Sequence, residues 1–263
     1  FLFLNKFMGR WPVVAAKKDK NAKAKAKINT IHSKLIALAA EKWADPNLNT
    51  SLADAIHTAK KEGVTADVID RAIARGAGLD KDAKKVEEIF YEGYGPGGIA
   101  VIVRALSDNR NRTAPNIRHI FSAFGGNLGE TGSVSNFMFD YVGKIVISRP
   151  ENIDNFEEKI FETPAEDYEI ENENITIWTA TTDLLETKKL LETFGYEILE
   201  SSFFYRAKNY TSVTDFEIAL KLYKLFDEFD EDEDVEVVWN NADIDDALWA
   251  EVEKFISERK FRT

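Results

Sequence analysis

One stretch of the chain holds every element that a small domain needs, and this constrains how the remainder folds. The spacing of apolar and turn residues predicts strand 144–149, helix 153–163, strands 167–171 and 174–179, helix 182–194 and strand 197–205. This βαββαβ order is the layout of a ferredoxin-like domain. The flanking segments cannot each close a domain, because 86–141 lacks a final helix and strand while 210–242 supplies only those. We therefore expect these two segments to form one discontinuous α+β domain, with 142–208 inserted in it.

Residues 17–80 predict a helical domain in front of these two. A helix is expected over 17–43 and ends at Asp45-Pro46, because proline disfavours helical backbone in the residue before it. A second helix over about 51–62, with Ser51 as its cap, and a third that follows Thr65 complete the domain. The sequence therefore predicts an α+β fold, in which an N-terminal three-helix domain precedes two α+β domains with ferredoxin-like βαββαβ elements, one inserted in the other.

The two ends of the chain lie outside these domains. Residues 1–16 are interpreted as an N-terminal extension or arm, and the stretch before Met8 lacks the long apolar core and cleavage site of a signal peptide. Residues 243–263 predict an amphipathic helix. Because no run of about 18 apolar residues occurs, we expect no transmembrane helix, no membrane partner and a cytoplasmic protein.

The charges are divided between the two halves of the chain. Residues 1–150 carry 23 lysines and arginines against 15 acidic residues, whereas residues 151–263 carry 11 against 31. The net charge of −12 hides this division. A basic front and an acidic rear indicate a molecule that meets a polyanion with one end only.

The strongest basic feature is the segment KKDKNAKAKAK, residues 17–27. Lysine is a flexible point charge that suits phosphate backbones and reads no base sequence, so binding here would be salt-sensitive and largely independent of sequence. The alternative is a solvated helix face or a frayed arm. Under the first interpretation, the nucleic-acid-binding lysines are Lys17, Lys18, Lys20, Lys23, Lys25, Lys27 and Lys34.

A second basic site is predicted where DNRNRT, residues 108–113, leads into a helix expected from Thr113. Arg110 and Arg112 lie beside free N–H groups at the helix N-terminus and can hold a phosphate or a carboxylate, with Arg118 further along the helix. The alternative is that Asn111 or Thr113 caps the helix while the arginines are solvated. The sequence leaves both interpretations open.

Two glycine-rich loops adjoin the predicted strands of the same domain. YEGYGPGG, residues 91–98, either presents amides to a phosphate or forms a tight turn into a central strand. It is not a P-loop, because the G-x-x-x-x-G-K-[ST] frame is absent. FGGNLGETGSVS, residues 124–135, offers Glu130 as an acid or base, but neither a histidine nor a second acid lies at a short fixed spacing. We expect no catalytic residue, and we expect a strand over 134–139.

Other residue types exclude further chemistry. The chain has no cysteine, which excludes disulfides, thiolate metal sites and cysteine nucleophiles. The three histidines lie far apart in the sequence, so neither a metal site nor a cofactor is expected. The acidic run at 227–236 lacks the central glycine and the spacing of a calcium loop, and it is interpreted as a solvated loop.

The block from Tyr91 to Asp140 resembles the signature of the YebC family, which includes bacterial YebC/PmpR proteins and the mitochondrial translational activator of cytochrome c oxidase. The stretches Met8–Trp11 and Ala55–Gly78 resemble the start and the helical domain of that family. Residues 1–7 and the helix at 243–263 depart from its pattern. The signature residues in this chain are Tyr91, Gly93, Gly95, Pro96, Gly97, Gly98, Asn109, Gly125, Gly126, Asn127, Gly129, Glu130 and Gly132.

The resemblance implies a three-domain fold and a non-enzymatic role in gene expression. The family carries two descriptions, a ribosome-associated translation factor that relieves stalling and a DNA-binding transcriptional regulator. We expect the first, with ribosomal RNA as the partner, because the lysine segment is blind to sequence and no helix has a clear set of base-reading residues. Promoter DNA is the alternative partner, and no small-molecule substrate is expected.

Overall fold

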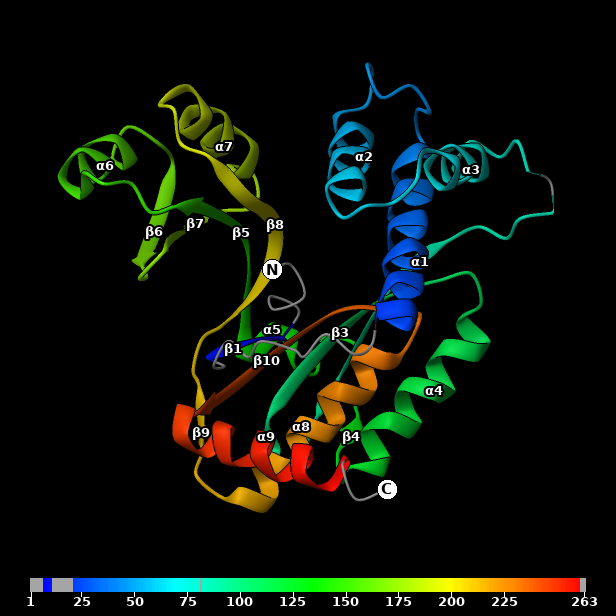
Figure 1. Cartoon of the computed structure of the whole chain (residues 1–263), viewed down its shortest axis with the longest axis vertical. Coiled ribbons are helices and arrows are strands. Elements are labelled where there is room, and N and C mark those ends of the chain that lie inside the picture. Colours follow the sequence, from blue (N-terminus) through cyan, green and yellow to red (C-terminus); the bar gives the residue numbers. More distant parts are fainter. Residues whose placement is uncertain (1–6, 11–20, 81, 261–263) are drawn as a thin grey trace. The chain divides into compact units, whose positions relative to one another are not determined.

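The computed structural model describes residues 7–10, 21–80 and 82–260, and the chain divides into two compact units (Figure 1). The first unit is formed by residues up to Val134 together with those from Tyr210 onward, and the second by Ser135–Asn209. The fold class predicted from the sequence, helices followed by two α+β domains with one inserted in the other, is confirmed. The chain passes between the two units at 134/135 and at 209/210, whereas the sequence predicts an inserted domain over 142–208.

Three helices begin the first unit: α1 (Asn21–Ala40), α2 (Thr50–Lys61) and α3 (Ala66–Gly76). Their shared core includes Ile36, Leu52 and Ile69. The cap of α2 is Asn49 and not Ser51, because the Asn49 side-chain oxygen accepts the N–H of Leu52 at 3.1 Å. Its amide N–H groups also donate to the carbonyls of Ala39 and Trp43 at 2.7 Å each. This residue therefore caps α2 and joins it to the end of α1.

The sheet of the first unit has the strand order β1-β10-β3-β2-β4, and β9 pairs with β10. The strands are β1 (Phe7–Arg10), β2 (Glu87–Tyr94), β3 (Ala100–Ser107), β4 (Asn127–Leu128), β9 (Thr211–Val213) and β10 (Val235–Ile244). β3 is central and buried along its length apart from Arg104, as its continuous apolar sequence predicts. β10 lies antiparallel beside it, so the C-terminal segment completes the domain that the inserted unit interrupts.

The edge strand β1 differs from the prediction of an arm over residues 1–16. Phe7–Arg10 pair in parallel with β10, and Phe7 lies opposite Val238. Backbone hydrogen bonding to an available sheet edge decides this pairing, and a local sequence pattern does not reveal it.

Three helices contribute to the core on one face of this sheet: α4 (Arg110–Ala123), α8 (Phe216–Glu231) and α9 (Asp246–Lys260). The C-terminal helix α9 packs on α8, where Phe255 lies edge-on to Phe216 with ring centroids 5.5 Å apart (Figure 1). The helix that departs from the family pattern therefore extends the core of the first unit.

The second unit is the predicted βαββαβ domain. Its elements are α5 (Ser135–Met138), β5 (Phe139–Ser148), α6 (Ile153–Ile160), β6 (Ala165–Ile170), β7 (Asn174–Thr179), α7 (Leu184–Thr193) and β8 (Ile198–Ala207). The sheet order is β6-β7-β5-β8, and α6 and α7 cover its Ile145 and Ile177 side. The predicted strand over 134–139 is wrong, because Val134 donates its N–H to Glu92 and a short helix precedes β5.

Candidate nucleic-acid interface

The predicted lysine segment lies partly outside the described residues. Lys17, Lys18 and Lys20 fall there, and Lys23 lies on α1 with its side chain outside the described atoms. Lys25 is exposed near the start of α1. Of the lysines predicted for this contact, Lys25 is therefore the one with a described, solvent-facing side chain.

Lys27 points into the protein instead. Its Nζ donates to the carbonyls of Phe229 and Asp230 in the last turn of α8, and it lies 3.6 Å from the Asp230 carboxylate. The last carbonyls of a helix have no partner within the helix and carry the negative end of its dipole, so a buried ammonium is favourable there. This lysine joins α1 to the end of α8.

Lys34, two helical turns further along α1, has the same role. Its Nζ lies 2.7 Å from Asp234 Oδ1 and donates to the Glu233 carbonyl at 2.9 Å. The side chains of Lys34 and Asp234 are only 8% and 6% exposed. The structure therefore directs both Lys27 and Lys34 to acceptors of this chain.

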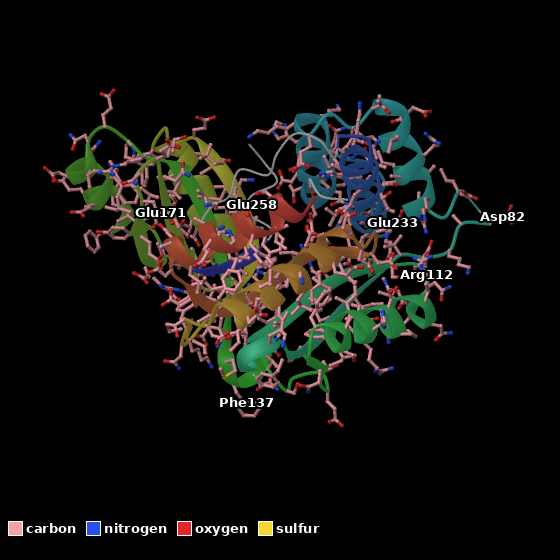
Figure 2. The ribbon with its side chains drawn as sticks, turned by 60° about the horizontal axis from the view of Figure 1, so that its bottom comes forward. Asp82, Arg112, Phe137, Glu171, Glu233 and Glu258 are labelled. Atoms are coloured by element: carbon pink, nitrogen blue, oxygen red, sulfur yellow. The ribbon has the colours of Figure 1, made fainter. Side chains whose placement is uncertain are left out.

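Asp234 also receives the arginine that the sequence offered to a phosphate or a carboxylate. Arg112 Nη2 donates to both carboxylate oxygens at 2.9 Å, and Thr113 Oγ1 donates at 2.7 Å. Figure 2 labels Arg112 and also Glu233, the residue before Asp234. Both donors lie in the first turn of α4, whose dipole favours an anion. Arg112 thus binds the carboxylate of Asp234, which lies between α8 and β10.

The interpretation of the run at 227–236 as a solvated loop is wrong at Asp234. Residues up to Glu231 continue α8, and Asp234 is buried. Burial raises the pKa of Asp234, but hydrogen bonds from Lys34, Arg112 and Thr113 outweigh it and hold the pKa below its ordinary value. This carboxylate is therefore ionised in the folded protein at neutral pH.

Two predicted cations remain on the surface of α4. Arg110 is 65% exposed and lies 3.5 Å from Glu87. Arg118 is also exposed and lies eight residues further along the helix. No acidic residue occurs in α4, although the domain around it is acid-rich. Three cations bind close acceptors of this chain, and we call them the inner cations: Lys27 and Lys34, which are buried, and Arg112, whose side chain is 57% exposed. We call Lys25, Arg110 and Arg118 the outer cations.

The glycines of the predicted loops serve the backbone. A Cβ on Gly93 would lie 2.4 Å from the Asn127 carbonyl oxygen, and one on Gly126 would lie 2.5 Å from that of Tyr94, so β2 and β4 approach closely only without side chains there. Gly97 and Gly98 have φ of 70° and 74°, which side chains rarely adopt. These positions therefore support the turn interpretation.

The remaining signature residues lie in the same turns and strands. They include Gly125 and Gly132 with positive φ, Gly95 and Pro96 in the turn after β2, Asn109 before α4, Asn127 in β4, Gly129 with its N–H on the Glu92 carbonyl, half-buried Tyr91 and exposed Glu130.

Glu92 is a structural residue that the sequence analysis did not select. Its side chain is buried, and its carboxylate accepts the N–H of Gly132 at 2.9 Å and that of Val134 at 2.8 Å. A carboxylate that holds two backbone donors fixes the path of the loop over 129–134. The signal for it in the sequence is an acidic residue between Tyr91 and Gly93, after the apolar and aromatic residues Ile89 and Phe90.

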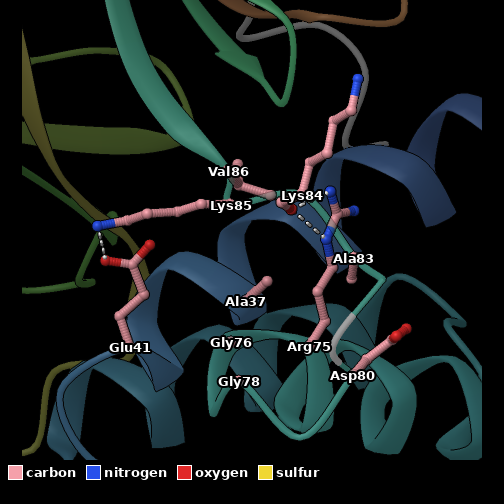
Figure 3. A pocket seen from close by; sticks show the side chains of 10 residues that line it. All are labelled: Ala37, Glu41, Arg75, Gly76, Gly78, Asp80, Ala83, Lys84, Lys85 and Val86. Carbon is pink, nitrogen blue, oxygen red and sulfur yellow. Dashed lines mark hydrogen bonds and ion pairs between the residues drawn. The ribbon is translucent and has the colours of Figure 1, made fainter.

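A pocket of about 310 Å³ lies where α1, α3 and the segment 78–86 meet (Figure 3). Arg75 at its wall donates to the Lys84 carbonyl at 2.8 Å and pairs with Asp108 at 3.0 Å. Lys85 pairs with Glu41 at 3.1 Å. Much of the charge around this pocket is therefore neutralised within the chain.

Two further findings concern the described part of the chain alone. No group of three or more histidine, cysteine, aspartate or glutamate side chains within it is arranged to hold a metal ion. Within the same residues, no helix has the length and apolar character needed to cross a membrane.

The fold and the site together define a basic helical domain that is docked on an α+β domain and followed by an inserted ferredoxin-like domain. Residues 9–79 match the family model for the TACO1/YebC protein N-terminal domain, and residues 86–242 match that for the TACO1/YebC second and third domain. The chain belongs to the TACO1/YebC family, and the resemblance found in the sequence is confirmed.

Curated relatives of this chain are named probable transcriptional regulatory proteins. One from Hathewaya histolytica is 42% identical over 245 residues, covering 92% of this chain and 98% of the relative. One from Clostridium novyi is 41% identical over 237 residues, covering 89% and 95%. The crystal structure of a conserved hypothetical protein from Aquifex aeolicus is similar with a TM-score of 0.78 at 35% identity, covering 90% and 97%.

Proposed function

We propose that this chain is a non-enzymatic regulator of gene expression that binds the phosphate backbone of a nucleic acid through its outer cations. The observation that carries the proposal is the exposed surface of α4, where Arg110 and Arg118 occur without an acidic residue in the helix. Such a surface attracts phosphates and reads little base sequence. Lys25 and the lysines before it extend the same charge from α1.

Duplex DNA is the partner that the names of the relatives support, since those proteins are called probable transcriptional regulators. Ribosomal RNA is the second candidate, and with it a role as a translation factor that relieves stalling. The lysine-rich start of α1 favours it, because lysine binds phosphates as a flexible point charge and such contacts carry no sequence information.

A charge-reversal experiment tests the surface. In Arg110→Glu/Arg118→Glu two outer cations become acidic, while Lys221→Glu/Lys224→Glu makes the same change in net charge at exposed positions of α8. We expect the first variant to lose about tenfold or more in affinity for duplex DNA or ribosomal RNA, and the second to stay within about threefold, because contacts with phosphate are local. Equal losses in the two variants would refute the α4 surface, since net charge alone would then explain binding.

A titration separates the two partners. Binding of the wild-type chain to a promoter duplex, a scrambled duplex and a ribosomal RNA fragment is measured at one stated salt concentration. A transcriptional regulator is expected to prefer its own promoter by about 10³ or more. A preference for the RNA, with the two duplexes bound equally, supports the translation factor instead.

A further inference from the structure

The helical domain is docked on the α+β domain through charged groups as well as apolar ones. The apolar part is small, with Ile31 and Ala37 of α1 against Leu106 and Val86. The charged part is made by Lys27 and Lys34, which lie on one face of α1 and reach the end of α8 and the residues after it.

Asp234 is the point at which these elements meet. Its carboxylate binds Lys34 of α1 and both Arg112 and Thr113 of α4, and its backbone carbonyl accepts the N–H of Leu106 in β3 at 2.8 Å. One buried side chain thus contacts the helical domain and the helix that carries two of the outer cations.

We propose that Asp234 is a positioning residue, whose charge holds α1 against α4 so that the outer cations of the two helices, Lys25 on α1 and Arg110 and Arg118 on α4, present one surface to a nucleic acid. The docking itself stands on the contacts above, and the alignment for binding rests on the proposed function. A nucleic acid that spans both sets gains from their fixed spacing, because the ordering cost is met before binding.

The physical reason is the cost of an uncompensated buried charge. With asparagine at 234, the ammonium of Lys34 remains buried without a counter-charge, and separation of α1 from the α+β domain is the way in which it regains water. With methionine at 34, Asp234 keeps Arg112 and Thr113 as partners. Asp234→Asn is therefore expected to open the junction more than Lys34→Met does.

The same reasoning predicts a rescue. In Asp234→Asn/Lys34→Met the buried ammonium is gone together with its partner, and the apolar methionine side chain occupies the same space. Replacement of both members of a buried pair by uncharged groups is much milder than removal of one. We expect the junction between α1 and the α+β domain to be less open in the double variant than in Asp234→Asn. If Asp234→Asn acted only by the loss of a contact, the second substitution would not restore the docking.

The absence of cysteine permits a direct measurement. Spin labels at Lys61→Cys on α2 and Ser122→Cys on α4 occupy exposed positions on the two sides of the junction. α2 moves with α1, since Glu62 at its end lies 2.9 Å from His32. The distribution of distances between the labels therefore reports docking, and it is recorded on the whole chain without nucleic acid.

We expect one narrow distribution for the labelled wild type and for the control Glu228→Gln, an exposed acid of α8. Asp234→Asn is expected to broaden it strongly, Lys34→Met weakly, and the double variant less than Asp234→Asn. If Asp234→Asn does not fold, the double variant must still yield folded protein with a distribution near that of Lys34→Met. A narrow distribution in folded Asp234→Asn, or a double variant as broad as or broader than Asp234→Asn, would overturn the proposal.

Binding is then measured on the same proteins. Asp234→Asn is expected to lose about tenfold in affinity for the nucleic acid that the wild type binds, and the double variant is expected to recover part of this loss. If the wild type binds no nucleic acid, the proposed function fails while the distances still decide the docking. If the junction opens but affinity stays the same, the alignment is refuted and the proposed function stands.

Discussion

The inner and the outer cations have similar sequence contexts but different partners within the chain, although Arg112 and Arg110 are 57% and 65% exposed. Lys25 and Lys27 are close neighbours in one lysine-alanine repeat, yet the first is exposed and the second is buried on α8. Arg110 and Arg112 belong to one DNRNRT segment, yet only Arg112 binds the carboxylate of Asp234. Acidic residues from the second half of this chain therefore neutralise some of the cations of the first half.

The basic first half and the acidic second half of the chain bind each other in part. The acidic second half is not merely held away from a nucleic acid, since Asp230 and Asp234 bind two lysines of the basic half. These pairs join α1 to the end of α8 and to the residue before β10, whereas the outer cations are exposed. Charge in this family member thus serves the fold and the surface at adjacent positions.

The largest expected effect is on stability. Asp234→Asn should lower the free energy of unfolding of the first unit by about 3 kcal/mol, because it leaves a buried lysine without its partner. Urea denaturation followed by tryptophan fluorescence measures this. Glu228→Gln, which removes an exposed charge from α8, should change it by less than about 0.5 kcal/mol. Equal effects in the two variants would remove the distinction between buried and exposed charge.

A smaller effect follows from acid. Because the pKa of Asp234 is held below its value in the unfolded chain, its carboxylate stabilises the fold above about pH 4, and this stabilisation is lost as the pH falls through the folded-state pKa. The difference in melting temperature between wild type and Asp234→Asn should therefore be constant from pH 7 to about pH 5 and shrink below about pH 4. A difference that grows toward low pH would contradict the assigned pairing.

Much of the fold is predictable because local patterns of apolar and polar residues indicate its helices and strands. The apolar run of β3, the helical spacing in α1 and the order of the βαββαβ unit each reflect burial of one face or of both. The insertion follows from counting elements that cannot close a domain alone. Where two residues could cap one helix, tertiary contacts distinguish them. Asn49 caps α2 and also donates to the carbonyl of Ala39 in the last turn of α1 and to that of Trp43 after it.

The site was less predictable for the same reason. Asp234 lies in a run of acids that resemble one another, and what distinguishes it is its place directly before the buried strand β10. Its partners Lys34 and Arg112 lie 200 and 122 residues away in the sequence, so no spacing within one segment reveals them. Charge patterning selected Lys34 and Arg112 as cations, but it did not show that the chain itself supplies their counter-charge.

The dependence of binding on salt tests the division into inner and outer cations most directly. Removal of a cation that contacts phosphate flattens the slope of log K against log salt concentration by about 0.9 on duplex DNA or about 0.7 on a single strand. We predict this flattening for Arg118→Ala and an unchanged slope for Lys34→Met. A slope that flattens as much for Lys34→Met as for Arg118→Ala, or that stays the same for Arg118→Ala, would contradict the account.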